Sequence, residues 1–185
     1  CFARSANRGA CAQFCRLAFD LVDADGKVVV KDKHLLSLKD MNSIAALEQM
    51  LDAGVVSFKI EGRLKENSYV KNVTAYYRSR LDEIFARRPE YVRSSHGVTR
   101  PQFVPSPAKS FNRGFTNYFL FGRGEDIASF DTPKSLGEQM GEIKMVKKNY
   151  IVVAGGSTFA NGDGACFIDD DGHLQGFRIN RVEGD

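Results

Sequence analysis

Four of the chain's five prolines lie between Pro89 and Pro107, and they separate two regions with different hydrophobic periodicity. Proline fixes extended backbone and removes an amide donor, so residues 91–112 are expected to form a proline-rich, basic linker. Residues 1–90 mix strand-like and helix-like patterns, whereas residues 113–185 carry short apolar runs between glycine-containing turns. The 185 residues are therefore predicted to form three parts with these boundaries.

The first part is predicted to open with a β-hairpin over residues 14–30. Apolar residues alternate on both sides of Asp23–Gly26, and an Asp-Ala-Asp-Gly sequence favours a tight turn. A calcium loop would need further oxygen ligands and a closing Glu, which this stretch lacks. A plain turn is the preferred interpretation.

Two strand–helix units are predicted after the hairpin. Strands at 35–38 and 55–60 each precede a helix. The first helix is expected to be capped by Asp40, Asn42 or Ser43 and to stop at Gly54, and the second to run from about Glu66 to Arg87. Strands alternating with helices over short connections are typical of a parallel α/β sheet. Two units cannot close such a sheet. The first part is therefore expected to be the end of a larger parallel α/β domain, whether barrel or doubly wound sheet, in a piece of a longer protein.

The last part is predicted to be a small closed β-barrel, which makes the whole chain an α+β fragment. Short strands are expected at 138–145, 150–154, 165–168 and 174–182, separated by Gly-rich or Asp-Gly turns.

The amino-terminal segment is rich in cysteine and arginine. Residues 1–19 contain three arginines, among them Arg4 and Arg8, and no acidic residue. Positive surroundings favour the thiolate form of Cys11 and Cys15, which binds metals or attacks electrophiles. Two cysteines are not a complete metal site. Metal ligation and small buried cysteines both remain open on spacing alone.

Charged residues follow the two predicted strands. Lys39 and Asp40 come after the first, and Lys59, Glu61 and Arg63 after the second. The carboxyl ends of barrel strands form the catalytic face, so these groups could hold an anion or act as an acid–base pair. A salt-bridge network with a helix cap is an equal alternative.

Residues 91–124 contain no acidic residue and combine basic with aromatic side chains. Basic groups contact phosphates and aromatic rings stack on bases, so this mixture suits RNA. The alternative is that the aromatic rings form the barrel core and the arginines its solvated rim. The residues of interest are Lys109, Phe111, Arg113 and Phe115.

Four segments together resemble one known family. Residues 4–16, 36–40 and 57–63 resemble motifs of the collagenase-like peptidase family, peptidase family U thirty-two, and residues 107–116 are similar to the linker motif of its longer bacterial members. The resemblance implies an amino-terminal, TIM-like α/β barrel, most of it absent from this chain, so that residues 1–90 would be the final βα units of an incomplete barrel. It also implies a small β-barrel similar to the second domain of translation elongation factors.

The resemblance implies two different activities. The family name comes from collagen degradation, for which no catalytic residues are agreed, whereas other members support hydroxylation of a transfer-RNA uridine or a ribosomal-RNA cytidine. Related proteins of ubiquinone synthesis bind a four-iron cluster through four cysteines. By position, Cys11 and Cys15 match the last two ligands, and the first two would lie upstream of this chain. Cys1 and Cys166 match no ligand.

The leading hypothesis is a cytoplasmic, iron–sulfur-dependent RNA hydroxylation factor, with ribosomal RNA favoured. A peptidase of unknown mechanism, or a β-barrel that only binds RNA or protein, are the alternatives. The fragment alone is expected to hold no complete cluster and to be inactive, and no membrane partner is expected. The proposed catalytic residues are Lys59, Glu61 and Arg63, the metal ligands are Cys11 and Cys15, and the substrate-binding residues are Arg4, Arg8, Lys39, Lys109, Phe111, Arg113 and Phe115.

Overall fold

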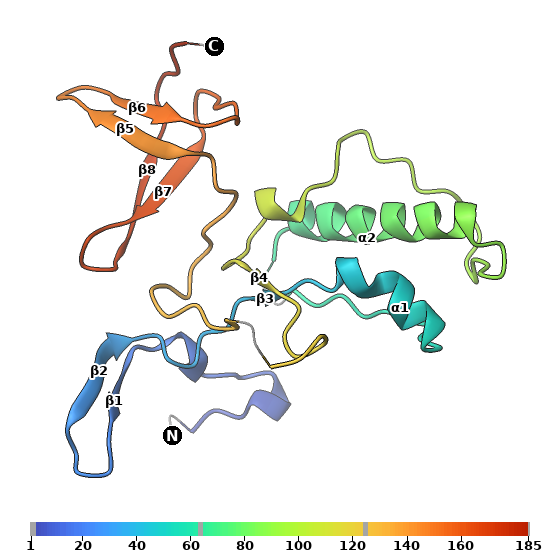
Figure 1. The fold of residues 1–185 in the computed structure, drawn as a ribbon, viewed down its shortest axis with the longest axis horizontal. Helices are drawn as coiled ribbons and strands as arrows, with labels where there is room; N and C mark the ends of the chain where they lie inside the picture. The colour runs from blue at the N-terminus through green and yellow to red at the C-terminus, as the bar shows by residue number, and fades with distance from the viewer. Residues whose placement is uncertain (1–2, 63–64, 124–125, 185) are drawn as a thin grey trace. The chain divides into compact units, whose positions relative to one another are not determined.

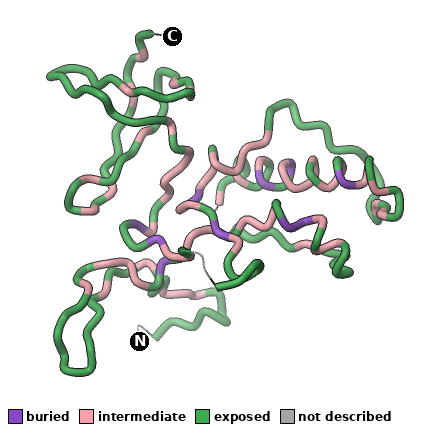
Figure 2. Tube along the Cα trace, in the orientation of Figure 1, coloured by how far each residue is buried: buried purple, intermediate pink, exposed green. Residues whose placement is uncertain are grey.

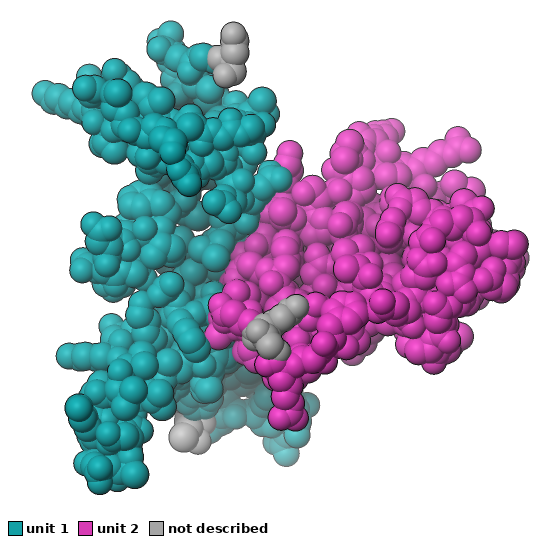
Figure 3. Space-filling model, in the orientation of Figure 1, with its two compact units in different colours: residues 1–37, 129–185 teal, residues 38–128 magenta. Residues whose placement is uncertain are grey.

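The computed structural model describes residues 3–62, 65–123 and 126–184. The chain divides into two compact units, shown in separate colours in Figure 3. The first unit combines residues 1–37 with 129–185, and the second comprises residues 38–128. The three-part division predicted from the sequence stays a prediction.

The first unit opens with the predicted β-hairpin (Figure 1). Two short 3₁₀ turns, η1 (Ala6–Arg8) and η2 (Phe14–Arg16), precede the antiparallel strands β1 (Phe19–Val22) and β2 (Val28–Lys33). The turn is closed by Asp23, whose Oδ1 accepts hydrogen bonds from the backbone amides of Asp25 at 3.0 Å and Lys27 at 2.9 Å. The hairpin prediction is confirmed, and the side-chain bonds of Asp23 are those of a turn.

The carboxyl-terminal residues of this unit form two further hairpins. Strands β5 (Glu142–Val146) and β6 (Ile151–Ala154) pair antiparallel, as do β7 (Gly164–Ile168) and β8 (Leu174–Arg178). The four strands lie where alternation and turn residues predicted them. In the described residues they form two separate two-stranded sheets. Their closure into a barrel stays a prediction.

The second unit is mainly helical. It contains β3 (Asp40–Met41), η3 (Ile44–Ala46), α1 (Leu47–Asp52), α2 (Asn67–Arg87), η4 (Pro107–Lys109) and β4 (Phe115–Thr116). The helix predicted for residues 66–87 is confirmed by α2. The shorter helix is confirmed too, and it ends before Gly54, whose φ of 87° stops helical geometry.

The two predicted parallel strands of the first part are wrong as elements of this structure. Residues 35–38 form a turn that ends in a single antiparallel bridge between Leu38 and Ala128. Residues 55–60 form no strand, and Val56 is 92% exposed. A parallel strand obtains its hydrogen bonds and its cover from neighbours on both sides, and the described chain supplies none here. The TIM-like fold class therefore remains a prediction.

The apolar core of the described residues lies in the second unit. Five hydrophobic side chains are buried there: Ala46 of η3, Leu47 of α1, and Val73, Ala75 and Ile84 of α2. Figure 2 marks buried positions along both helices. Val73 and Ile84 are eleven residues apart, so helical spacing places them on one face of α2. None of the described helices has the length and apolar character needed to span a membrane.

Candidate functional site

The cysteine pair lies in the irregular segment before β1. Cys15 is exposed within η2, and Cys11 is half-buried before it; both are free thiols. Gln13 between them adopts left-handed backbone geometry with φ of 55°, and its amide donates to Cys11 Sγ at 3.4 Å. Hydrogen bonds from backbone amides to sulfur ligands are a feature of iron–sulfur sites, so the local backbone geometry suits a metal ligand at Cys11.

The donor chemistry of this pair fits two positions of an iron–sulfur site. Neither thiol is consumed in a disulfide, and Cys15 is open to solvent. A four-iron cluster takes four thiolates, so two ligands must come from elsewhere. Cys1 lies outside the described residues. Cys166, on β7, directs its thiol to the carbonyl oxygen of Leu136 at 3.4 Å.

Three potential metal ligands also approach one another at the turn after β7. Asp169, Asp171 and His173 place ligand atoms within 4.8 Å of one another. Asp169 accepts hydrogen bonds from the His173 amide and from Gln175 Nε2, both at 2.7 Å. The bond from Gln175, followed by that from the His173 amide, lowers the pKa of Asp169. These bonds close the hairpin turn and account for the grouping.

Lys59 and Glu61 form an ion pair in the segment after α1. Lys59 Nζ lies 2.5 Å from Glu61 Oε1, and both side chains are largely exposed. The hydrogen bond between them raises the pKa of Lys59 and lowers the pKa of Glu61. Proton transfer works best when a pKa lies near the operating pH, and both shifts move away from neutrality. The geometry favours an ion pair over an acid–base pair. Arg63 lies outside the described residues.

In the second unit, Asp40 and Arg113 form an ion pair with three hydrogen bonds. Asp40 Oδ2 accepts hydrogen bonds from the Arg113 backbone amide at 2.9 Å and from Nε at 3.1 Å, and Oδ1 accepts from Nη2 at 2.7 Å. The Arg113 side chain is 12% exposed and that of Asp40 is 28% exposed. The pair joins the starts of β3 and β4, which pair in parallel register with Asp40 beside Phe115.

Lys39 lies next to this pair but has a different partner. Its Nζ is 3.0 Å from Asp126 Oδ2, and its aliphatic carbons cover Gly114, at 3.6–3.7 Å from where a Cβ would lie. The bond from Lys39 is the main cause of the lowered pKa of Asp126. Two cations that the sequence assigned to substrate binding, Lys39 and Arg113, are thus each paired with a carboxylate of their own unit.

The remaining substrate-binding candidates lie in different surroundings. Arg4 and Arg8 are exposed in the first unit, and Phe115 is a partly exposed residue of β4. Lys109 ends η4 and is exposed, whereas Phe111 is half-buried beneath the ammonium group of Lys65, which precedes α2. The structure therefore brings Lys39, Arg113 and Phe115 together at the β3–β4 pair. Lys109 and Phe111 line a different groove, although the Phe111 ring also lies 5.7 Å from the guanidinium carbon of Arg113.

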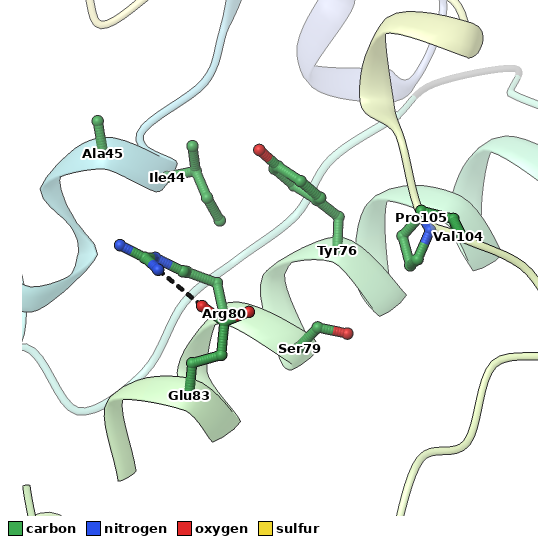
Figure 4. A pocket seen from close by; sticks show the side chains of 8 residues that line it. All are labelled: Ile44, Ala45, Tyr76, Ser79, Arg80, Glu83, Val104 and Pro105. Atoms are coloured by element: carbon green, nitrogen blue, oxygen red, sulfur yellow. Dashed lines mark hydrogen bonds and ion pairs between the residues drawn. The ribbon is translucent and has the colours of Figure 1, made fainter. Parts of the chain in front are cut away.

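The second unit also has a hollow of about 450 Å³, which is lined by none of the predicted site residues (Figure 4). Apolar Ile44 and Val104 line it together with Tyr76 of α2. Its charged residues, Arg80 and Glu83, pair with each other at 2.6 Å. Because these charges are already paired, the hollow offers no convergent set of polar groups for chemistry.

Sequence reasoning missed two asparagines that order the second unit. Asn112 is 2% exposed; its Nδ2 donates to the carbonyl oxygens of Ala108 and Ser110, each at 3.0 Å. Asn72 of α2 bonds to Ser106 and Ser110 of the linker. The available signal was the polar side chain of Asn72 within the helix, which indicates that this position of α2 contacts a polar partner. Its partner, however, is 34 or 38 residues away.

Comparison with known proteins places these features in one family. The family model described as peptidase family U32 matches residues 1–129, which include the cysteine segment, the Lys59–Glu61 pair and the β3–β4 pair. The chain belongs to peptidase family U32.

Its curated relatives carry two kinds of name. The 23S rRNA 5-hydroxycytidine synthase of Escherichia coli is 50% identical over 180 residues, covering 97% of this chain and 27% of that protein. A collagenase of Porphyromonas gingivalis is 35% identical over 119 residues, 64% of this chain and 31% of its own length. The tRNA hydroxylation protein P1 of Bacillus subtilis is 36% identical over 96 residues, 49% of this chain and 23% of its own.

The chain thus spans between about a quarter and a third of the length of these relatives. No solved structure gives a significant match.

Proposed function

We propose that the protein to which this chain belongs supports iron–sulfur-dependent hydroxylation of RNA, with a cytidine of ribosomal RNA as the favoured target. The observation that carries the proposal is the extent of the similarity to the 23S rRNA 5-hydroxycytidine synthase. That alignment spans 97% of the chain at 50% identity, so it includes most of the residues after 129, where the family model ends. The ribosomal RNA target also makes the cytoplasm the proposed compartment.

The cysteine segment supports the iron–sulfur part of the proposal. Cys11 and Cys15 would supply two of the four thiolates, and the hydrogen bond from the Gln13 amide to Cys11 Sγ would hold that ligand in place. The cluster, when bound, would supply one-electron redox chemistry to the oxidation of the base. The other two ligands would come from residues outside this chain.

The cluster is tested in full-length protein purified without oxygen. Wild-type protein should show the broad visible absorption of an iron–sulfur centre and bound iron and sulfide. Cys11→Ser with Cys15→Ser should remove both signals. Cys166→Ser is the matched control, because its thiol already has the Leu136 carbonyl oxygen as partner. A double variant with unchanged absorption and iron content would refute the assignment of these two ligands.

The RNA reaction is tested separately in cells. Deletion of the gene should remove one hydroxylated cytidine from large-subunit ribosomal RNA, measured by mass spectrometry of nuclease digests. Complementation with the wild-type gene should restore it, and complementation with the Cys11→Ser, Cys15→Ser gene should not. Digests identical before and after deletion would refute ribosomal RNA as the substrate; a change confined to transfer RNA would redirect the proposal to that RNA.

A peptidase is the second candidate, and the 35% identity to a collagenase over 64% of the chain favours it. Purified full-length protein would be incubated with acid-soluble collagen and with gelatin, beside a mock purification from the deletion strain. Cleavage that follows the protein through successive columns would support this activity. Cleavage present equally in the mock preparation would refute it.

A further inference from the structure

A second, larger groove of about 800 Å³ lies along the first part of α2, wholly within residues 38–128. One wall comes from residues 65–72, at and before the start of α2, and the other from residues 103–111 of the linker. The side chains that define its chemistry are three lysines and three aromatic residues: Lys65, Lys71, Lys109, Tyr69, Phe103 and Phe111.

The groove is electropositive. Its three lysines face a single acidic residue in the lining, Glu66, which gives a formal net charge of +2. The first turn of α2 contains no acidic residue. The amides of that turn add the partial positive charge of a helix amino terminus, which attracts phosphate groups. An anion in this groove would therefore meet cationic side chains from both walls.

Aromatic rings line the same groove. Phe103 is 46% exposed, although burial of so large an apolar surface would be favourable. Lys65 Nζ lies 2.8 Å from the centroid of the Phe111 ring, so a cation and a ring surface are presented together. Flat rings next to ammonium groups are what a stacked base and its neighbouring phosphate require.

The family motif at residues 57–63 contacts the groove through Gly62. A Cβ at Gly62 would lie 2.6 Å from Cε1 of Tyr69 and 2.9 Å from Cγ of Lys65. Only glycine lets the backbone approach these two lining residues so closely. The motif therefore fixes the position of one end of the helix wall.

The two walls are held together by Asn72. Its Nδ2 donates to Ser106 O and to Ser110 Oγ, both at 2.6 Å, and its Oδ1 accepts from the Ser106 amide at 2.8 Å. These three bonds hold the linker beside α2 before any ligand arrives, and such preorganisation lowers the entropic cost of binding. The groove therefore combines fixed walls, basic side chains and aromatic rings, which suit an extended anion.

We infer that this groove binds a single strand of RNA, with the three lysines on successive phosphates and the exposed ring of Phe103 against a base, while Phe111 positions Lys65. The inference rests on the proposed function, because RNA hydroxylation supplies the reason for an RNA ligand. An acidic protein segment would match the lysines, but the exposed ring of Phe103 would remain without a stacking partner. Single-stranded RNA uses both features.

The charge component is tested with full-length protein and a fluorescein-labelled oligouridylate of about ten nucleotides. The variant Lys65→Gln, Lys71→Gln, Lys109→Gln should reduce the slope of log affinity against log salt by about 2, since each single-strand phosphate contact contributes roughly 0.7. The matched control replaces three exposed lysines of the first unit, Lys27, Lys147 and Lys148, by Gln. An equal loss in both triple variants would reveal unspecific attraction and overturn the inference, as would an unchanged slope in the first.

The stacking component is tested with single aromatic variants. Phe103→Ala should weaken binding about tenfold. Phe121→Ala should not, although Phe121 is 55% exposed and belongs to the same acid-free stretch. Circular dichroism of each variant establishes that it is folded. If Phe121→Ala and Phe103→Ala weaken binding equally, the groove is not the binding site.

The two proposals can fail independently. If gene deletion leaves ribosomal and transfer RNA unchanged, RNA hydroxylation is refuted, while the oligouridylate measurements still decide the groove. If the lysine variant keeps wild-type affinity and salt slope, the groove is refuted, while the nucleoside digests still decide the reaction.

Discussion

The ion pair between Asp40 and Arg113 should control the local stability of the β3–β4 pair. Asp40→Asn removes the charge but keeps the size of the side chain. It weakens three hydrogen bonds that reach Arg113 at 2.7–3.1 Å. Breaking a fully buried pair costs about 3–5 kcal/mol, and a surface pair is worth about 0–1 kcal/mol. With side chains 12% and 28% exposed, this pair lies between these limits, at about 2 kcal/mol.

Amide hydrogen exchange in the full-length protein measures this cost where it arises. Two amides report on the pairing: that of Asp40 donates to Gly114 O and that of Asn42 to Thr116 O, both at 2.9 Å. A loss of about 2 kcal/mol in local opening free energy should speed their exchange roughly 30-fold. Arg80→Gln is the control, because its pair with Glu83 is 47% and 60% exposed and should change exchange by no more than about twofold.

Exchange in Asp40→Asn within about twofold of wild type would show that the pair is energetically a surface pair despite its burial. Equal acceleration in peptides of β7 and β8, which belong to the other unit, would show a global loss of stability and remove the local interpretation.

Two further predictions concern the β5–β6 hairpin and the end of α1. Gly155→Ala would place a Cβ 2.3 Å from the carbonyl oxygen of Met140, a backbone atom that cannot move aside cheaply, so β5–β6 peptides should lose about 1–3 kcal/mol of exchange protection; unchanged protection would contradict the close approach. The pKa of Asp52 lies below its ordinary value of 3.8, mainly because Arg88 donates a hydrogen bond to it. Because the pKa of Asp52 is lower in the folded than in the unfolded protein, its ionised form stabilises the fold at pH values above the unfolded pKa. This stabilisation is lost as the pH falls through the folded pKa, so hydrogen-exchange protection at the end of α1 should fall below about pH 4. Arg88→Gln should flatten this pH dependence, and an equal dependence in that variant would contradict it.

Local signals in the sequence were sufficient for the elements that stabilise themselves. The first hairpin was predictable because Asp23 closes its own turn with bonds to residues two and four positions away. The helix α2 was predictable because its apolar residues recur at helical spacing, and its observed start at Asn67 is one residue from the expected one. In both cases the decisive interactions lie within one element or one turn.

The β3–β4 pair was not predictable, because two-residue strands carry no periodicity. Its partners are joined by Asp40 and Arg113, which are 73 residues apart. The strand predicted at residues 55–60 failed for the opposite reason. Its apolar residues have the composition of a buried strand, but strand formation depends on neighbours that the described residues do not supply, and Val56 is left 92% exposed.

The acid-free stretch at residues 91–124 shows why charge along a sequence differs from charge on a surface. Arg113 belongs to it, yet its guanidinium is paired with Asp40, which precedes α1. Lys109 belongs to it as well, but shares its groove with Lys65 and Lys71, which lie outside the stretch. An RNA strand responds to the potential of the folded surface, and this is set by the second arrangement. The stretch therefore contributes Arg113 to an internal ion pair and Lys109 to the groove that we propose for RNA.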